Sequence, residues 1–281
     1  MFLRRYGSDG FYGDLARTRL DVLRESKAQE QAAAEVAPSA QAAVGLASSA
    51  VAVAAYPREL TVDIQTIEEA ARSRKAADSG DSTAMVNLGL TYLSGRGVTK
   101  DETEAARWFR KAADADNAIG MTNLGLMYEN GNGVAKDYSE AIRWYSKAAD
   151  ASYAPGMNNL GVMYANGKGV TQDDAEAVRW YRKAADAGNA TAMNNLGFMY
   201  VSGKGATQDD AEGLRWFWKA ADAGDAPAMN NLGWMYENGR GIASDYERAR
   251  EWYEKAVAAG YPLAQAEVER VRQLERQQGK K

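Results

Sequence analysis

Side chains that could bind phosphate or a cation, or catalyse hydrolysis, recur along the chain at one fixed interval. Gly203 and Gly205 form a Gly-x-Gly pair of the kind that can cradle a phosphate, and Asp209 and Asp210 could act as a carboxylate pair or a cation site. Equivalent glycines return every 36 residues, and so does the first aspartate. A phosphate-binding loop follows a strand and occurs once in a fold. The spacing therefore predicts glycine turns and aspartate helix caps instead.

The composition removes several classes of site. The 281 residues include no His and no Cys, which excludes an imidazole base, a thiolate nucleophile, a disulfide and sulfur ligands for zinc. The net charge is -4 at pH 7 with the two signs interspersed, which argues against nucleic acid as a partner. We therefore predict no catalytic residue, no metal site, no cofactor and no enzymatic activity.

The 36-residue period predicts a chain of helix pairs. Five repeats begin at Ser82, Ala118, Ala154, Ala190 and Ala226. In each repeat an apolar stripe with helical spacing is followed by the glycine pair, and a second helix then begins at an Asp that has Glu three residues later in four repeats. No stretch alternates polar and apolar residues as a strand would.

A tryptophan occupies one position of every second helix. One repeat cannot bury its own aromatic face, so neighbouring repeats must stack, and we predict that these rings form the core. The residues are Trp108, Trp144, Trp180, Trp216 and Trp252.

The repeat resembles the Sel-one-like repeat, a relative of the tetratricopeptide repeat. In the third repeat the matching residues are Leu160, Gly161, Tyr164, Gly167, Gly169, Val170, Asp173, Ala177, Trp180, Lys183 and Ala184. The resemblance implies an all-α fold, a right-handed superhelical α-solenoid of antiparallel helix pairs, and adaptor or scaffold roles in bacteria. Some members of the family are cysteine-rich and disulfide-clamped, and this chain departs from that branch.

The predicted organisation has four parts. Residues 1–35 are expected to form a helical arm, 36–62 an Ala/Ser-rich linker, 63–276 the solenoid with a capping half-repeat at each end, and 277–281 a tail. The Ala/Ser/Val-rich stretch is mostly Ala, with Pro38, Gln41 and three Ser, and is not apolar enough for a transmembrane span, so none is expected. Polar residues at the ends, among them Arg72, Ser73 and Glu269, predict that the repeats do not stack end to end and that the protein is a monomer. The compartment stays open, with the cytoplasm favoured over the periplasm or secretion.

The candidate binding surface is the face of the first helices that does not join the core. It takes in positions 5, 6, 9 and 12 of the repeat, counted from Ser82 as position 1. The candidates are Asn158, Asn194 and Asn230 at position 5, Asn159, Asn195 and Asn231 at position 6, Phe198 and Trp234 at position 9, and Glu129 and Glu237 at position 12. In related solenoids the first helices line the concave surface, so the stripe is expected to face a groove.

Two interpretations of that stripe are open. Asn side chains can grip a peptide backbone, but they can equally bond to the adjacent repeat, and the two rings can equally cover the next helix. We expect a non-enzymatic scaffold that binds a protein partner, as an extended peptide or a helix, in the groove. The alternative is an envelope-associated or secreted protein whose aromatic groove binds cell-wall or glycan ligands.

Overall fold

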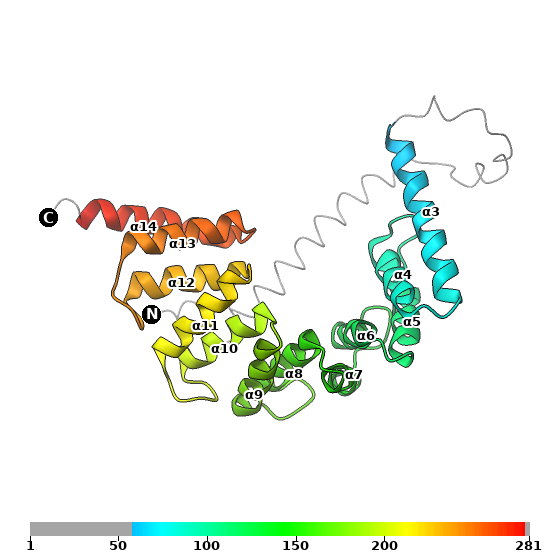
Figure 1. Cartoon of the computed structure of the whole chain (residues 1–281), viewed down its shortest axis with the longest axis horizontal. Helices are drawn as coiled ribbons and strands as arrows, with labels where there is room; N and C mark the ends of the chain where they lie inside the picture. Colours follow the sequence, from blue (N-terminus) through cyan, green and yellow to red (C-terminus); the bar gives the residue numbers. More distant parts are fainter. Residues whose placement is uncertain (1–57, 279–281) are drawn as a thin grey trace. The chain divides into compact units, whose positions relative to one another are not determined.

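The computed structural model describes residues 58–278, which belong to one compact unit, residues 58–281. Every regular element in this part is helical, and consecutive helices lie side by side in chain order (Figure 1). The helices are α3 Arg58–Asp78, α4 Ser82–Ser94, α5 Glu102–Asp114, α6 Ala118–Asn130, α7 Tyr138–Asp150, α8 Ala154–Asn166, α9 Asp174–Asp186, α10 Ala190–Ser202, α11 Asp210–Asp222, α12 Ala226–Asn238, α13 Tyr246–Ala258, the 3-10 turn η1 Pro262–Ala264 and α14 Gln265–Gln278. The all-helical α-solenoid predicted from the sequence is confirmed.

The predicted arm, residues 1–35, and most of the predicted linker lie outside the described residues. Helix α3 begins at Arg58, so residues 58–62, assigned to the linker, are its first residues. No Gly or Pro interrupts the sequence between Arg58 and Asp78, and nothing there ends a helix. None of the helices described is long and apolar enough to cross a membrane.

Each repeat folds as two helices because its turn residues stop one helix and start the next. Gly203 ends α10 in the left-handed conformation, with φ of 67°, which costs a residue without Cβ little. Asp209 then caps α11, since its side chain accepts a hydrogen bond from the backbone N–H of Glu212 at 2.9 Å. The structure therefore confirms the predicted role of Gly203 as a turn residue and of Asp209 as a helix cap.

The second glycine of each pair joins one repeat to the one before it. Gly133 has φ of 64°, and a Cβ on it would lie 2.0 Å from the carbonyl oxygen of Glu102, at the start of the preceding second helix. Gly205 stands in the same relation to Asp174, also at 2.0 Å. Any side chain here would separate adjacent repeats, so the close approach requires glycine.

Within a repeat, a glycine of the first helix lies against an aromatic ring of the second. A Cβ added to Gly161 of α8 would lie 2.6 Å from the ring of Tyr181 in α9, and Gly125 meets Tyr145 in the same way. The small residue at position 8 and the large one at position 28 therefore allow the two helix axes to approach closely.

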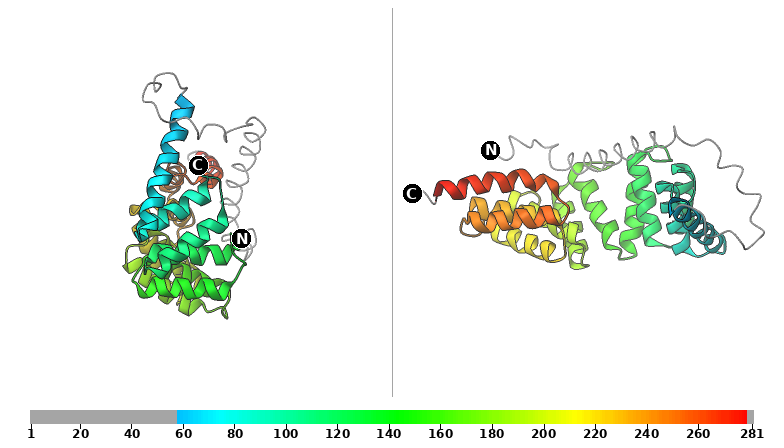
Figure 2. Two further views of the ribbon diagram at one scale, coloured as in Figure 1. Left: turned by 90° about the vertical axis from the view of Figure 1, so that its right-hand side faces the viewer. Right: turned by 90° about the horizontal axis from the view of Figure 1, so that it is seen from above.

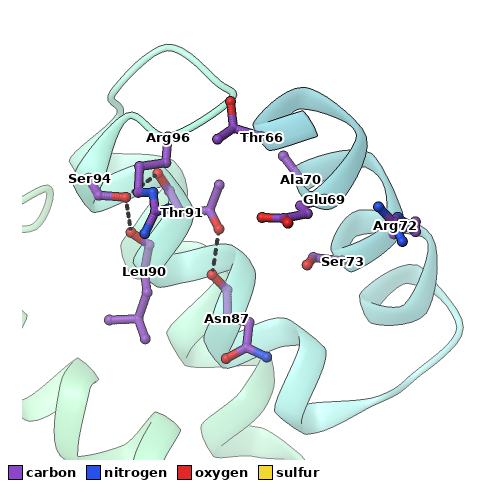
Figure 3. Close-up of a pocket in the computed structure, with 10 residues that line it drawn as sticks. All are labelled: Thr66, Glu69, Ala70, Arg72, Ser73, Asn87, Leu90, Thr91, Ser94 and Arg96. Carbon is purple, nitrogen blue, oxygen red and sulfur yellow. Dashed lines mark hydrogen bonds between the residues drawn. The ribbon is translucent and has the colours of Figure 1, made fainter. Parts of the chain in front are cut away.

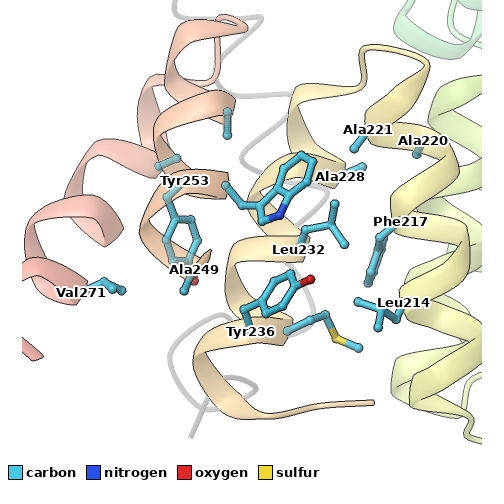
Figure 4. Close-up of a cluster of buried hydrophobic side chains, with 14 of the residues drawn as sticks. Leu214, Phe217, Ala220, Ala221, Ala228, Leu232, Tyr236, Ala249, Tyr253 and Val271 are labelled. Carbon is cyan, nitrogen blue, oxygen red and sulfur yellow. The ribbon is translucent and has the colours of Figure 1, made fainter. Parts of the chain in front are cut away.

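The core is a series of clusters, each shared between neighbouring repeats. Four tryptophans of the predicted core column, Trp108, Trp144, Trp216 and Trp252, are buried, and Trp180 is half-buried. Figure 4 shows the last cluster, where Phe217 of α11 and Leu232 and Tyr236 of α12 lie near Tyr253 of α13. A lysine three residues after each tryptophan places its ammonium 3.8–4.4 Å from the indole centroid, so the solvent edge of the column is covered by cations.

Helix α14 covers the C-terminal end of the array and lies beside α13 (Figure 2). Its inner face buries Val268 and Val271. Arg270 forms an ion pair with Glu237 of α12, and Arg250 of α13 pairs with Glu275 at 3.1 Å. Apolar burial combined with these ion pairs fixes α14 where the first helix of a sixth repeat would stand.

Candidate ligand-binding stripe and terminal pocket

The asparagines of the stripe form a ladder between adjacent first helices. Asn195 of α10 donates from Nδ2 to Oδ1 of Asn158 in α8 at 3.0 Å, and Asn231 of α12 donates to Asn194 of α10 at 2.8 Å. All four of these side chains are buried. Position 6 of one repeat thus bonds to position 5 of the repeat before it, which is the structural alternative left open by the sequence.

The remaining two candidate asparagines differ from these four. Asn159 and Asn230 are half-buried rather than buried. Asn159 accepts a long contact of 3.5 Å from the amide of Asn158, and its side chain also forms a hydrogen bond with Tyr145 of the preceding repeat. These two amides are the part of the ladder that a ligand can reach most readily.

Phe198 and Trp234 lie in adjacent first helices and are both half-buried. Phe198 packs against the core clusters on both sides of α10, and Trp234 packs against the last cluster, around α12 and α13. The guanidinium carbon of Arg240 lies 5.7 Å from the Trp234 ring centroid. Each ring therefore has one surface on the core and some surface left exposed.

The two glutamates of position 12 are held in ion pairs. Tyr145 donates to Glu129 at 2.8 Å, and Lys168 of the following repeat donates to it at 2.9 Å. Glu237 accepts from Tyr253 at 2.9 Å as well as from Arg270, and its side chain is only 7% exposed. Both carboxylates therefore connect helices within the solenoid.

Burial and the neighbouring carboxylate raise the pKa of Tyr145 and of Tyr253, so both phenols stay protonated and act as donors. Sequence reasoning missed this pairing, although a signal existed. The repeats with Glu at position 12 have Tyr at position 28, whereas Phe109 and Phe217 accompany the aliphatic Leu93 and Val201.

Asp225 is a second residue that the sequence did not single out. It caps α12 by accepting from the backbone N–H of Ala228 at 2.8 Å, and it is only partly exposed. Burial raises its pKa to about 6, although hydrogen bonds from Ala228 and Thr191 act in the opposite direction. The equivalent caps of α6 and α10 are the uncharged Asn117 and Asn189.

A pocket of about 460 Å³ opens between α3 and α4, at the N-terminal end of the array (Figure 3). Its lining includes Glu69, Arg72 and Ser73 from α3. From the first repeat it includes Asn87 at position 6, Leu90 at position 9, and Arg96 in the turn after α4. The pocket therefore lies at the end of the same stripe.

A family model of the Sel1 repeat matches five consecutive segments of the chain. They are residues 82–117, 118–153, 154–189, 190–225 and 226–261, in the register predicted from the sequence. Together they make up more than half of the chain, which therefore belongs to the Sel1 repeat family. Proteins of this family are generally non-enzymatic protein-interaction scaffolds.

Solved structures show the same fold. A protective antigen of uropathogenic Escherichia coli with an SLR fold is 37% identical, with a TM-score of 0.62, and the match covers 70% of this chain but only 42% of that protein. A Sel1 repeat protein from Oxalobacter formigenes is 30% identical, with a TM-score of 0.63, over 74% of this chain and 86% of that one. An immunity protein from Pseudomonas aeruginosa is 25% identical, with a TM-score of 0.50, over 65% and 67% of the two chains. No curated protein matches the chain.

Proposed function

We propose that this chain is a non-enzymatic scaffold whose first helices hold an extended peptide or a helix of a protein partner. Membership of the Sel1 repeat family supports a protein partner. The observation that carries the finer proposal is position 9, where the residue type changes from Leu through Val to Phe and Trp while the side chains keep some exposed surface. Core positions 7 and 11 keep Leu and Tyr in all five repeats.

Phe198 and Trp234 are the proposed anchors of the ligand. Helices that stack in adjacent repeats lie roughly 10 Å apart, which matches about three residues of an extended chain at about 3.3 Å each. Large aromatic side chains that keep one exposed surface are the usual energetic centres of protein interfaces. Asn159 and Asn230 would supply neutral donors and acceptors beside them.

The buried members of the stripe have a positioning role in this proposal. The Asn195–Asn158 and Asn231–Asn194 bonds set the relation between adjacent first helices, and hence the spacing of the two rings. Glu129 and Glu237, neutralised by their ion pairs, fix the second helix of the same repeat beneath the stripe.

The test uses peptides selected from an unbiased library of displayed 12-residue sequences on the immobilised full chain. Selected peptides are labelled, and their affinity is measured by fluorescence anisotropy for the wild type and for Phe198→Ala/Trp234→Ala. Truncating a central anchor typically costs at least about 2 kcal/mol, so we expect the double variant to bind at least tenfold more weakly.

The matched control is Trp218→Ala. Trp218 is also a half-buried ring but lies on a second helix, where it meets Trp252 edge-on at 4.7 Å. It should lose stability and keep peptide affinity. The proposal that the first helices form a peptide-binding groove would be refuted if the wild type and the double variant, compared per folded molecule, bound every selected peptide with equal affinity.

A further inference from the structure

Among the residues that the structure describes, no first helix precedes α4, whereas every later first helix follows another one. Asn195 and Asn231, at position 6, are buried against an amide of the preceding first helix. Asn87 occupies position 6 of α4, and its side chain is exposed. Leu90, at position 9, is 45% exposed, whereas its equivalents in the other four repeats are half-buried.

The turn after α4 carries a cation, Arg96, that has no ionic partner among residues 66–278, the part of this unit whose side chains the structure describes. Arg96 occupies position 15, and its equivalents Lys168 and Arg240 pair with carboxylates of the preceding repeat at 2.9 and 2.5 Å. The partner of Lys168 is Glu129, which is at position 12 of the preceding first helix. Arg240 instead pairs with Asp210 of the second helix α11, so Lys168 is the equivalent that shows how a preceding first helix can bring an acid to position 15.

Helix α3 departs from the other second helices in a complementary way. Ser73 stands at position 28, where the repeats have Phe or Tyr, so the ring that would lie against position 8 is missing. Glu69 stands at position 24, where the repeats have Ala or Gly. That position faces the first helix, since a Cβ on its equivalent Gly213 would lie 2.4 Å from Val201 and 2.9 Å from the carbonyl oxygen of Gly197.

Glu69, Ser73, Asn87 and Leu90 are among the residues that line the pocket. Figure 3 shows Glu69 and Ser73 on the α3 side of the pocket, and Asn87 and Leu90 on the α4 side, with the Leu90 side chain pointing away from α3. We propose that this pocket receives one helix of a partner protein, which takes the place that the first helix of a preceding repeat would have. It is a second contact site, at the N-terminal end of the stripe, and it shares no anchor residue with the site proposed around Phe198 and Trp234.

The lining specifies the chemistry of that helix. Opposite Asn87 it carries Asn, Gln, Ser or Thr, as position 5 does in the ladder. Three residues later it carries Lys or Arg, which faces Glu69 in the space left by Ser73. Four residues further it carries Asp or Glu, which pairs with Arg96. These spacings fall on one helix face.

The printed sequence contains no segment with this pattern. The required helix is therefore assigned to a different protein rather than to a second copy. Charge also disfavours a second copy. Within residues 58–278, α14 is the only helix at an end of the array that stands in the place of a first helix. Its residue at position 8 is Glu269, which would face Glu69 and repel it.

The test uses synthetic helices derived from the chain itself. A fluorescein-labelled peptide of residues 118–130 already has Thr122 at position 5 and Glu129 at position 12, and a hydrocarbon bridge on its outer face holds it helical. The Gly125→Lys form completes the pattern, and the Gly125→Glu form is the matched control. Fluorescence anisotropy with the full chain should show at least a tenfold preference for the Gly125→Lys peptide.

The reciprocal variant is Glu69→Lys, an exposed position whose replacement leaves the fold intact. It should reverse the preference, so that the Gly125→Glu peptide binds better. Phe198→Ala/Trp234→Ala should leave both affinities unchanged, which separates this site from the proposed groove. Equal binding of the two peptides, no binding of either, or an unreversed preference with Glu69→Lys would each overturn the proposal.

Discussion

Replacing Asp225 by Asn tests whether the charge of one helix cap weakens the solenoid near neutral pH. Asp225 caps α12 from a partly buried site, and its pKa is raised from 3.8 to about 6 in the folded protein. The change of about two units corresponds to about 3 kcal/mol at 1.36 kcal/mol per unit. The uncharged caps Asn117 and Asn189 accept the same kind of backbone hydrogen bond, at 3.0 and 2.8 Å.

The direction of the pH dependence follows from proton binding. The folded protein holds the Asp225 proton more tightly than the unfolded chain does, so the free energy of unfolding falls as pH rises from about 4 through 6. We expect Asp225→Asn to be more stable than the wild type by up to about 3 kcal/mol at pH 7.5. As the pH falls to the unfolded pKa of 3.8, the unfolded chain binds the proton as well, so the difference should fall to less than about 1 kcal/mol at pH 4 and vanish at lower pH.

The assay is urea unfolding followed by circular dichroism at pH 4, 5, 6 and 7.5. The reciprocal control is Asn189→Asp, which introduces a carboxyl at the equivalent cap of α10 and should destabilise at pH 7.5 but not at pH 4. The reasoning is refuted if Asp225→Asn is no more stable than the wild type at pH 7.5, or if its advantage persists unchanged at pH 4.

Three further experiments test the packing of the repeats. Trp144→Ala should lower the free energy of unfolding by about 3–5 kcal/mol, and Trp180→Ala should lower it by less, because the first ring is buried and the second half-buried. Equal urea midpoints for the two variants would contradict this. Gly224 has φ of 87° and open space around it, so Gly224→Ala should lower stability by about 1–2 kcal/mol. Gly133→Ala should lower it by more, because the new Cβ would meet a carbonyl oxygen. Thermal melting of the two variants measures which one is less stable. Deleting residues 262–281 bares the apolar face of α12 and α13, so the truncated protein should aggregate, as measured by light scattering. A soluble monomer with an unchanged melting temperature would show that this face needs no cover.

The helix architecture could be predicted because its determinants are local and repeated. Asp209 caps its helix by bonding to a backbone N–H three residues away, and Gly203 ends its helix because glycine adopts the left-handed conformation readily. The tight helix pairing within a repeat was not predicted, although a Gly at position 8 such as Gly161 accompanies an aromatic residue at position 28 such as Tyr181 in every repeat.

The candidate stripe could be predicted only as a set of positions, because burial depends on which neighbours are present. Asn87 and Asn231 are the same residue at the same position, yet the first is exposed and the second is buried. Glu237 was a ligand candidate because its position varies, but its carboxylate bonds to Tyr253 and to Arg270, which is 33 residues away. The terminal pocket depends on how α3 and α4 lie against each other, and no residue pattern of its own marks it.

The glycine-to-carbonyl contact makes the 36-residue segment an interchangeable module. At four of the five junctions the glycine meets a main-chain carbonyl oxygen, as Gly133 meets Glu102 and Gly241 meets Asp210. A main-chain contact does not depend on side-chain identity, so this contact can form between any two repeats, unlike side-chain contacts such as Asn195–Asn158. Duplication or loss of a whole repeat in the gene would then lengthen or shorten the array in single steps, whereas a one-residue insertion between the helices would displace the glycine and separate the stack. The length of the array is thus free to change in evolution faster than the main-chain contact that joins its repeats.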